Sequence, residues 1–154
     1  MKKGFTLIEL LVVISIIGVL AALALVSFGP SQKQARDTQR KSDLKQYQTA
    51  LENFANNNNS LYPSRKQVQK ISNTVILCIP LGITGECPTD PKFDSDPSIY
   101  DYYYISDGSG NGTITATEYL LWSVLEGNGG YWVVCSGGKT GTTTTAPTAV
   151  TCPL

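Results

Sequence analysis

The apolar residues of this chain are concentrated at its beginning, where residues 5–28 contain a single charged side chain, Glu9. A helix rises about 1.5 Å per residue, so this run would be roughly 36 Å long and would cross a bilayer core of about 30 Å. The pattern therefore predicts a membrane-spanning helix. A lone carboxylate at the middle of such a helix costs about 3 kcal/mol, so we expect Glu9 to have a compensating partner.

Small residues interrupt the large apolar side chains of this run. Gly18 and Ala22 form a small-xxx-small pair, and Ser15 lies nearby. Small side chains let helices approach closely in lipid, so we expect packing against other helices, although ordinary membrane-helix composition explains the residues equally well. Gly29 and Pro30 then interrupt the pattern. Proline removes one helical hydrogen bond and disfavours helix at the preceding residue, which predicts a kink or a melted turn.

An amphipathic helical pattern follows from residue 31 to about residue 56. Leu44, Tyr47, Leu51 and Phe54 recur at helical spacing and form an apolar stripe that a sheet could cover. Residues 31–43 have almost no apolar face, so we expect them to face solvent or another subunit. A run of asparagines then ends the helix, because asparagine competes with the helical backbone for hydrogen bonds.

Short strands are predicted in the second half of the chain. Residues 75–79 fit a short strand within a proline-rich connector, and residues 100–105, 119–125 and 131–135 fit three further strands. The last two are joined by a glycine-rich turn typical of a hairpin. Residues 137–154 are rich in threonine and glycine and are expected to be irregular. An antiparallel sheet packed on the apolar stripe of the helix gives an α+β fold.

Charge is unevenly distributed, although the formal net charge is +0. Residues 31–58 hold five basic and three acidic side chains, whereas residues 71–154 hold two basic and eight acidic ones. A basic stalk and an acidic head attract each other between subunits, or both are simply solvated faces, which is the default interpretation.

Four cysteines, Cys78, Cys87, Cys135 and Cys152, all follow the apolar run. An even number in a small exported domain indicates disulfides. The local pairing, Cys78 with Cys87 and Cys135 with Cys152, is one of three connectivities. A zinc site is the rival interpretation, but the chain has no histidine and no Cys-x-x-Cys spacing. Disulfides require an oxidising compartment.

Residues 107–118 fit the twelve-residue calcium loop of an EF-hand. The oxygen ligands would come from Asp107, Ser109, Asn111, the Thr113 carbonyl and Glu118. However, strand-like sequence flanks the loop where an EF-hand needs two helices. The alternative is a glycine-rich hairpin whose polar residues cap backbone groups. With only two formal negative charges, any calcium affinity should be weak, with a Kd of about 10⁻⁴ M or higher.

No pattern of a catalytic site is present in the sequence. The chain has no histidine, no glycine-flanked nucleophile and no phosphate-binding loop ahead of a helix. We therefore expect a protein that is not an enzyme and needs no cofactor, with calcium as the one candidate. Basic residues between Lys33 and Lys70 could contribute to nucleic-acid binding, but a solvated stalk is the simpler account.

The N-terminus resembles the class III signal peptide of the type IV pilin and type II secretion pseudopilin family. The resemblance is carried by Lys2-Lys3-Gly4-Phe5-Thr6-Leu7-Ile8-Glu9-Leu10. It implies that a membrane peptidase, the prepilin peptidase, cleaves between Gly4 and Phe5 and N-methylates Phe5. It also implies that Glu9 registers each subunit against a neighbour's N-terminus during assembly. A freed ammonium at Phe5 would lie four residues before Glu9, on the same helical face.

Two simpler interpretations of the N-terminus fit less well. The apolar run is longer than the core of an ordinary secretory signal, although Ala22-Leu23-Ala24 is an acceptable cleavage site. A plain single-span anchor fits the length but leaves Glu9 and the junction between Gly4 and Phe5 unexplained.

Major pseudopilins hold calcium in a carboxy-terminal loop, so the resemblance also supports the calcium prediction.

Together these features predict a pilin-like organisation. We expect a leader (1–4), a membrane-spanning and filament-core helix (5–30), an amphipathic half-helix (31–60), a variable connector (61–98), a sheet (99–136) and a disulfide-tethered tail (137–154). The resemblance implies a subunit that resides in the cytoplasmic membrane, meets an inner-membrane assembly platform and polymerises into a helical surface filament. The alternatives are a pseudopilin of a secretion or DNA-uptake system, a minor tip pilin, and a membrane-anchored calcium-binding or adhesive protein.

Overall fold

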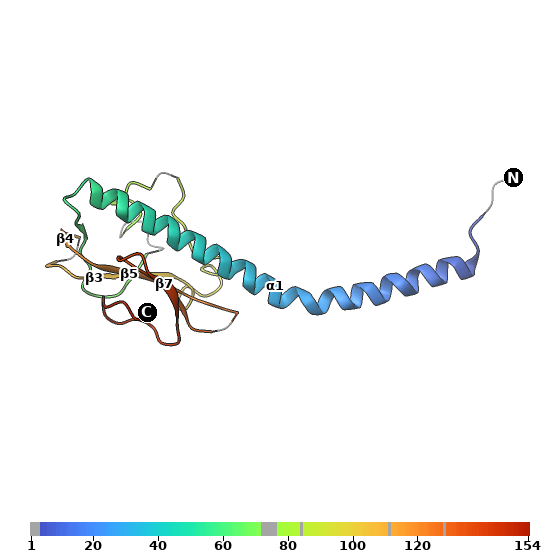
Figure 1. The fold of residues 1–154 in the computed structure, drawn as a ribbon. Coiled ribbons are helices and arrows are strands. Elements are labelled where there is room, and N and C mark those ends of the chain that lie inside the picture. Colours follow the sequence, from blue (N-terminus) through green and yellow to red (C-terminus); the bar gives the residue numbers. More distant parts are fainter. Residues whose placement is uncertain (1–3, 72–76, 84, 111, 128) are drawn as a thin grey trace.

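A single long helix and a small β-sheet head make up the molecule (Figure 1). The computed structural model describes residues 4–71, 77–83, 85–110, 112–127 and 129–154, with residues 24–27 described by their backbone only. Helix α1 runs from Leu7 to Asn56. Its first half extends away from the head as a stalk, and its second half packs on the sheet. The predicted end of the helix at residue 56 is confirmed.

The helix bends but does not break near its middle. Pro30 lies inside α1, and the helical parts Leu7–Leu23 and Phe28–Asn56 are inclined by 45°. A bend is expected here because the proline ring clashes with the carbonyl four residues earlier and offers no N–H. The alternative expectation of a melted turn at Gly29 and Pro30 is wrong, because both residues are helical.

The predicted membrane span, residues 5–30, contains this bend. Among the described residues, no single unbent helix has the length and apolarity to cross a membrane. The bent pair Leu7–Leu23 and Phe28–Asn56 meets that test by length and composition.

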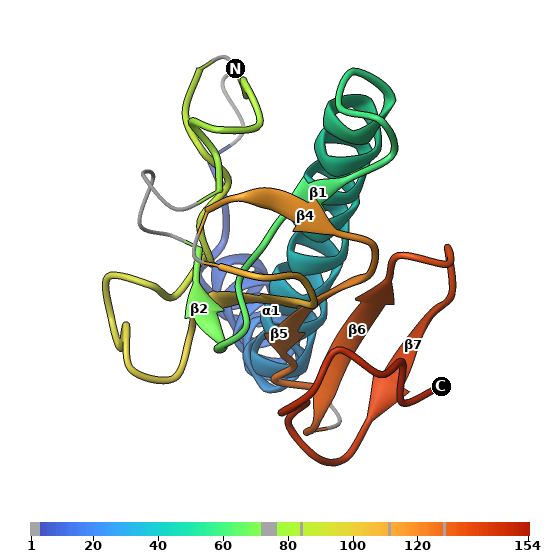
Figure 2. The same ribbon diagram turned by 90° about the vertical axis from the view of Figure 1, so that its left-hand side faces the viewer.

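The head contains a five-stranded antiparallel sheet that covers one side of α1 (Figure 2). Its strand order is β2 (Gln69–Lys70), β3 (Tyr102–Ser106), β5 (Tyr119–Val124), β6 (Tyr131–Cys135) and β7 (Thr140–Thr143). A separate two-stranded ladder joins β1 (Tyr62–Pro63) to β4 (Ile114–Ala116). The predicted α+β class and the β5–β6 hairpin are confirmed.

Two strand predictions are corrected. The tail was expected to be irregular, but its residues 140–143 form β7 along β6, because threonine favours strands. Residues 77–79 form a turn in place of the predicted strand, in which the Leu81 N–H donates to the Leu77 carbonyl. Val75 and Ile76 lie outside the described residues.

The main core lies between α1 and the sheet. Leu44, Tyr47 and Leu51 of the predicted stripe are fully buried, whereas Phe54 is only half-buried. They meet alternate residues of three strands, Tyr102, Tyr104, Tyr119, Leu121 and Val134. The intervening residues of the same strands form a second apolar cluster, Ile105, Leu120, Trp122, Val133 and Cys135, against which Cys152 of the tail packs. The sheet is therefore apolar on both faces.

Tyrosine hydroxyls inside the main core all have fixed acceptors. The Tyr102 hydroxyl donates to Asp43 Oδ2 at 2.6 Å, and the Tyr119 and Tyr62 hydroxyls both donate to the Glu52 carboxylate, at 2.8 and 3.0 Å. A buried hydroxyl without a partner would be costly. Acidic side chains of α1 therefore accept hydrogen bonds from three tyrosines of the head, whereas the Tyr104 hydroxyl donates to the Pro63 carbonyl.

Both predicted disulfides are confirmed. Cys78 pairs with Cys87 across a Cα–Cα distance of 5.9 Å, and Cys135 pairs with Cys152 across 5.8 Å. The first closes a loop of the connector. The second ties the tail to the end of β6.

Two buried serines of the sheet should respond oppositely to replacement by alanine. The Ser123 hydroxyl is buried and has no hydrogen-bond partner among the described residues, so Ser123→Ala should stabilise the head by about 1 kcal/mol. The Ser106 hydroxyl donates to the Pro63 carbonyl and accepts from the Arg65 N–H. Ser106→Ala should therefore destabilise by about 1–2 kcal/mol. Urea unfolding of the detergent-solubilised chain measures the stability of both variants. A change of the same sign in the two variants would contradict the prediction.

Candidate assembly site

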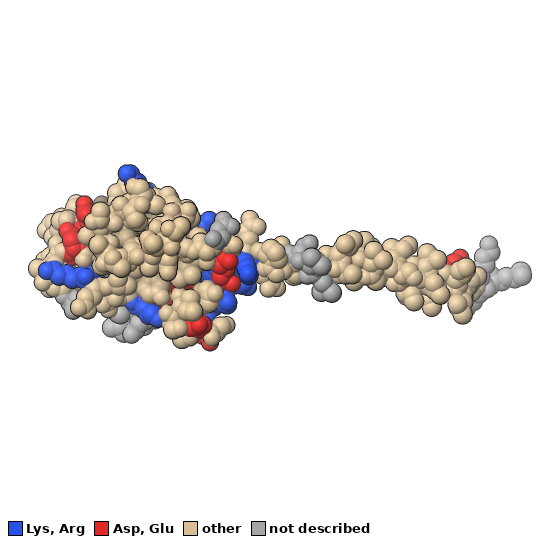
Figure 3. Space-filling view, turned by 90° about the horizontal axis from the view of Figure 1, so that it is seen from below, with Lys and Arg blue, Asp and Glu red and all other residues tan. Residues whose placement is uncertain are grey.

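The stalk carries an apolar surface that no described part of its own chain covers. The large apolar side chains that are exposed between Phe5 and Phe28 have exposed fractions of 47% to 88%. Charged side chains gather on the head and are nearly absent from the stalk (Figure 3). An exposed apolar surface of this extent marks an interaction with lipid or with other protein.

The predicted processing site lies just outside this helix. Gly4 and Phe5 have no regular secondary structure, and α1 begins at Leu7 with Thr6 as its N-cap. The side chain of Phe5 is 88% exposed, and a side chain added at Gly4 would meet open space. Residues 1–3 lie outside the described residues. The peptide bond between Gly4 and Phe5 is therefore accessible.

Glu9 has hydrogen-bond partners within its own chain. The Thr6 N–H and the Thr6 hydroxyl both donate to Glu9 Oε2, at 2.8 and 2.7 Å. The Glu9 N–H donates in return to Thr6 Oγ1 at 3.4 Å. This reciprocal arrangement is a capping box. It compensates the carboxylate before any cleavage, a partner other than the freed amine that was expected. Pairing of Glu9 with the amine of Phe5 stays a prediction.

The small residues of the stalk have open space around them. A side chain added at Gly18 would meet nothing within 4 Å, and the Ser15 hydroxyl donates to the Leu11 carbonyl of its own helix at 2.8 Å. Ala22 is exposed. Their role in helix packing stays a prediction.

An ionic network, centred on Arg40, holds the head to α1 where the stalk ends. Arg40 is fully buried. Its guanidinium donates to Asp90 through Nε at 2.7 Å and Nη2 at 2.9 Å, and its Nη1 contacts Asp37 Oδ1 at 2.7 Å and Glu126 Oε1 at 2.8 Å. Its partners come from α1, the connector and the turn after β5. One side chain therefore joins three segments that are distant in sequence.

A second arginine extends the network. Arg36 makes a two-point contact with Glu126, with Nε–Oε1 at 2.8 Å and Nη2–Oε2 at 2.6 Å. The Asp37 carboxylate accepts the backbone N–H groups of Glu126 and Gly127 at 3.0 and 2.9 Å. The expectation that residues 31–43 face solvent or another subunit is therefore wrong for Arg40, Asp37 and Asp43, which are buried against the head.

The network shifts the pKa values of Arg40 and Glu126 so that both side chains remain charged. Burial lowers the pKa of Arg40, but hydrogen bonds to Asp90, Glu126 and Asp37 outweigh burial and raise it above the ordinary value. Hydrogen bonds from Arg36 are the largest cause that lowers the pKa of Glu126, to about 2, with Arg40 adding to the effect and desolvation opposing it. Basic residues in the second half of α1 and acidic residues of the head thus attract each other within one chain, contrary to the default interpretation of solvated faces.

A spacing signal for this network was present in the sequence but was overlooked. Asp37 and Arg40 precede Leu44, Tyr47 and Leu51 at intervals of three and four residues, so they continue the apolar stripe toward the stalk. A charged residue on the line of a buried stripe indicates a buried ion pair. Nothing in the spacing identified Asp90 or Glu126 as the partners.

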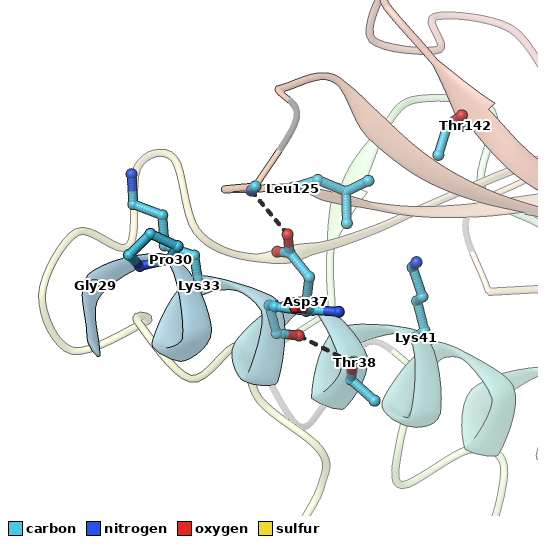
Figure 4. A pocket seen from close by; sticks show the side chains of 10 residues that line it. Gly29, Pro30, Lys33, Asp37, Thr38, Lys41, Leu125 and Thr142 are labelled. Atoms are coloured by element: carbon cyan, nitrogen blue, oxygen red, sulfur yellow. Dashed lines mark hydrogen bonds between the residues drawn. The ribbon is translucent and has the colours of Figure 1, made fainter. Parts of the chain in front are cut away.

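A groove lies beside the network, between α1 and the head (Figure 4). It has a volume of about 690 Å³ and is lined by Gly29, Pro30, Lys33, Gln34, Asp37, Thr38, Lys41, Leu125, Gly127 and Thr142. In Figure 4, Asp37 points from α1 toward the turn after β5, and Lys41 points toward the sheet. The Lys41 ammonium lies 4.6 Å from the centre of the Trp132 ring. The groove is therefore polar, unlike the adjoining stalk.

The predicted calcium ligands are used differently in the described structure. Both Asp107 oxygens accept hydrogen bonds, Oδ2 from the Thr117 hydroxyl at 2.6 Å and Oδ1 from the backbone N–H groups of Thr117 and Glu118 at 2.7 and 2.9 Å. Burial raises the pKa of Asp107, but these bonds outweigh it and leave the pKa below its ordinary value. The Thr113 carbonyl accepts the N–H of Ser64 at 2.7 Å.

This arrangement fits the capped hairpin better than an EF-hand. Strands β3 and β5 flank the loop, and β4 lies inside it. Ser109 donates to the Thr115 hydroxyl. Gly108 has a φ of +94°, and an added Cβ would lie 2.7 Å from the Ser64 hydroxyl. The backbone conformation and the packing therefore require glycine there, whether or not calcium binds. The described residues include no group of three or more His, Cys, Asp or Glu that could hold a metal ion. Asn111 lies outside them, and the calcium ligand set stays a prediction.

Comparisons with known proteins find one family model and several relatives. A family model described as the prokaryotic N-terminal methylation motif matches residues 1–25. The type IV major alpha-pilin of Moraxella bovis is 31% identical over 117 residues, which are 75% of this chain and 68% of that protein. The type IV major pilin protein PilA of Myxococcus xanthus is 44% identical over 53 residues, 34% of this chain and 24% of that protein.

A further relative is a secretion protein. The type II secretion system core protein G of Pseudomonas aeruginosa is 41% identical over 66 residues, 43% of this chain and 46% of that protein. The matched region thus spans less than half of the Myxococcus xanthus and Pseudomonas aeruginosa relatives. No solved structure matches the chain.

Replacing Glu126 should weaken the ionic network in a pH-dependent way. Glu126→Gln should lower the free energy of unfolding at pH 7 by about 3 kcal/mol. The carboxylate stabilises fully above its unfolded pKa, and this is lost as the pH falls toward the folded pKa of about 2. The difference from wild type should therefore shrink between pH 5 and pH 2.5, as denaturant unfolding measures. Glu86→Gln, at an exposed position, is the control, and a pH-independent difference would contradict the prediction.

Asp107→Ala should destabilise the hairpin with or without calcium. The variant loses three hydrogen bonds to Thr117 and Glu118, which should cost about 1–3 kcal/mol. Glu118→Ala is the matched control, because its side chain is exposed yet belongs to the predicted calcium ligand set. Thermal unfolding with millimolar calcium or with a chelator measures both variants. Calcium-dependent stabilisation of wild type that Glu118→Ala abolishes would support the calcium site instead.

Proposed function

Since the chain belongs to the type IV pilin family, we propose that it is a structural subunit that polymerises through the stalk of α1 into a helical surface filament. The exposed apolar surface of the stalk is the observation that carries this proposal. In the membrane, lipid covers that surface. In a filament, the stalks of other copies cover it, with Ser15, Gly18 and Ala22 permitting close approach. The mechanism is association rather than turnover.

Processing precedes assembly in this proposal. Prepilin peptidase cleaves between Gly4 and Phe5 and methylates Phe5, in keeping with the matching methylation motif. An inner-membrane assembly platform then draws the subunit from the cytoplasmic membrane into the filament. Glu9, already held by Thr6, becomes available to the amine of Phe5 in its own or a neighbouring copy.

A pseudopilin is the second candidate. The similarity to the type II secretion system core protein G favours it, and such a subunit would polymerise through the same stalk. The head distinguishes the two roles only through its partners. Nucleic-acid binding has less support, because Arg36 and Arg40, in the second half of α1, are already paired with carboxylates of the same chain.

Glu9→Ala should separate processing from assembly. We expect the variant to be cleaved after Gly4 and to remain in the membrane, while filament yield falls by more than about tenfold, as expected when one partner of a buried charge pair is removed. Mass spectrometry of the N-terminus and electron microscopy of shed surface material measure the two steps. Glu86→Ala, in the head, is the control. Wild-type filament yield from Glu9→Ala would contradict the role of Glu9, and a wild-type chain that keeps residues 1–4 would contradict the proposed function.

A further inference from the structure

The scissile peptide bond and the start of α1 are separated by one residue. Thr6 has φ −81° and ψ 152°, an extended conformation, and the helix begins at the next residue. The first helical hydrogen bond runs from the Leu10 N–H to the Thr6 carbonyl at 3.3 Å. Phe5 and Gly4 therefore precede the helix, although Phe5 belongs to the same apolar run as the stalk.

The capping box is what stops the helix at this point. The Thr6 hydroxyl accepts the Glu9 N–H and donates to the Glu9 carboxylate, while the Thr6 N–H donates to the same carboxylate. These bonds satisfy N–H groups that a helix start would otherwise leave without partners. Both Thr6 bonds to the carboxylate require Thr6 to remain extended. Without them, the boundary between helix and extended chain is free to move toward Phe5.

We propose that Thr6 is a positioning residue for leader removal. By capping α1, it keeps the backbone on both sides of the peptide bond between Gly4 and Phe5 in an extended conformation. The inference rests on the proposed function, which supplies the peptidase. Hydrolysis consumes one water, breaks the bond between the Gly4 carbonyl carbon and the Phe5 nitrogen, and leaves a carboxylate on Gly4 and an amine on Phe5. A peptide bond inside a helix has to open before a peptidase can bind it, and cleavage then follows the population of the open form.

Glu9 takes a second role in this inference. Its carboxylate reaches back to Thr6 and adds to the cap, whereas the bond from the backbone N–H of residue 9 to the Thr6 hydroxyl does not need the Glu9 side chain. Glu9→Ala should therefore still be cleaved, although more slowly than wild type. The role belongs to the precursor and ends when the leader is removed. The role proposed above for Glu9 in the filament begins only after that step.

Variants of Thr6 can separate capping from side-chain shape. Thr6→Val keeps the shape but removes the hydroxyl, whereas Thr6→Asn changes the shape and keeps a strong capping oxygen. Full-length precursors in detergent or lipid vesicles are incubated with the host's prepilin peptidase, and cleavage is followed by mass spectrometry. We expect Thr6→Val to be cleaved about fivefold more slowly, as expected for the loss of a cap, and Thr6→Asn and Thr6→Ser to be cleaved at the wild-type rate.

A further variant keeps the inference testable if Thr6→Val inserts poorly. Thr6→Ala also lacks the hydroxyl and should be slow for the same reason. Wild-type cleavage of both Thr6→Val and Thr6→Ala would overturn the inference. Slow cleavage of Thr6→Asn would also overturn it, because the peptidase would then be reading the threonine side chain directly. Either result would leave the proposed function as a filament subunit unaffected, whereas an uncleaved wild-type chain would contradict the proposed function itself.

Discussion

The buried guanidinium of Arg40 is the constraint on which the position of the head depends. Removing a charge from water costs several kcal/mol unless it is paired and hydrogen-bonded. Arg40 meets this condition only when three segments are in place at once: its own helix through Asp37, the connector through Asp90, and the turn after β5 through Glu126. Apolar contacts between α1 and the sheet tolerate small shifts, but a guanidinium in two-point contact with a carboxylate has one favoured geometry. The network therefore specifies how the helix and the head are aligned.

The two halves of α1 differ in what covers their apolar side chains. The half on the head has its apolar stripe covered by the sheet, and the charges of its network are paired within the chain. The apolar surface of the stalk is left exposed by the residues that the structure describes, and the carboxylate of Glu9 accepts hydrogen bonds from Thr6. Association can thus cover the stalk without breaking any interaction that holds the head. This separation suits a subunit that has to be folded before it joins an assembly.

Sequence patterns predicted the parts of the fold that depend on local spacing. The stripe of Leu44, Tyr47 and Leu51, the β5–β6 hairpin and the local disulfide pairing follow from periodicity, turn residues and neighbouring cysteines. The partners of buried polar groups did not follow, because Asp90 and Glu126 are distant from Arg40 in sequence and only the tertiary fold brings them together. The Thr6–Glu9 capping box was readable from a spacing of three residues. It was overlooked because Glu9 was considered only as a partner for a freed amine.

Each disulfide joins cysteines that are close in sequence, nine residues apart in the connector and seventeen apart at the tail. If the head enters an oxidising compartment in the order of its sequence, the first bond can close before the second pair has arrived. Oxidation in order of emergence therefore yields the native pairing directly, with no exchange between wrong partners. Maturation of the head then needs an oxidant but little help from an isomerase, and the tail is secured only when the last residues of the chain have been delivered.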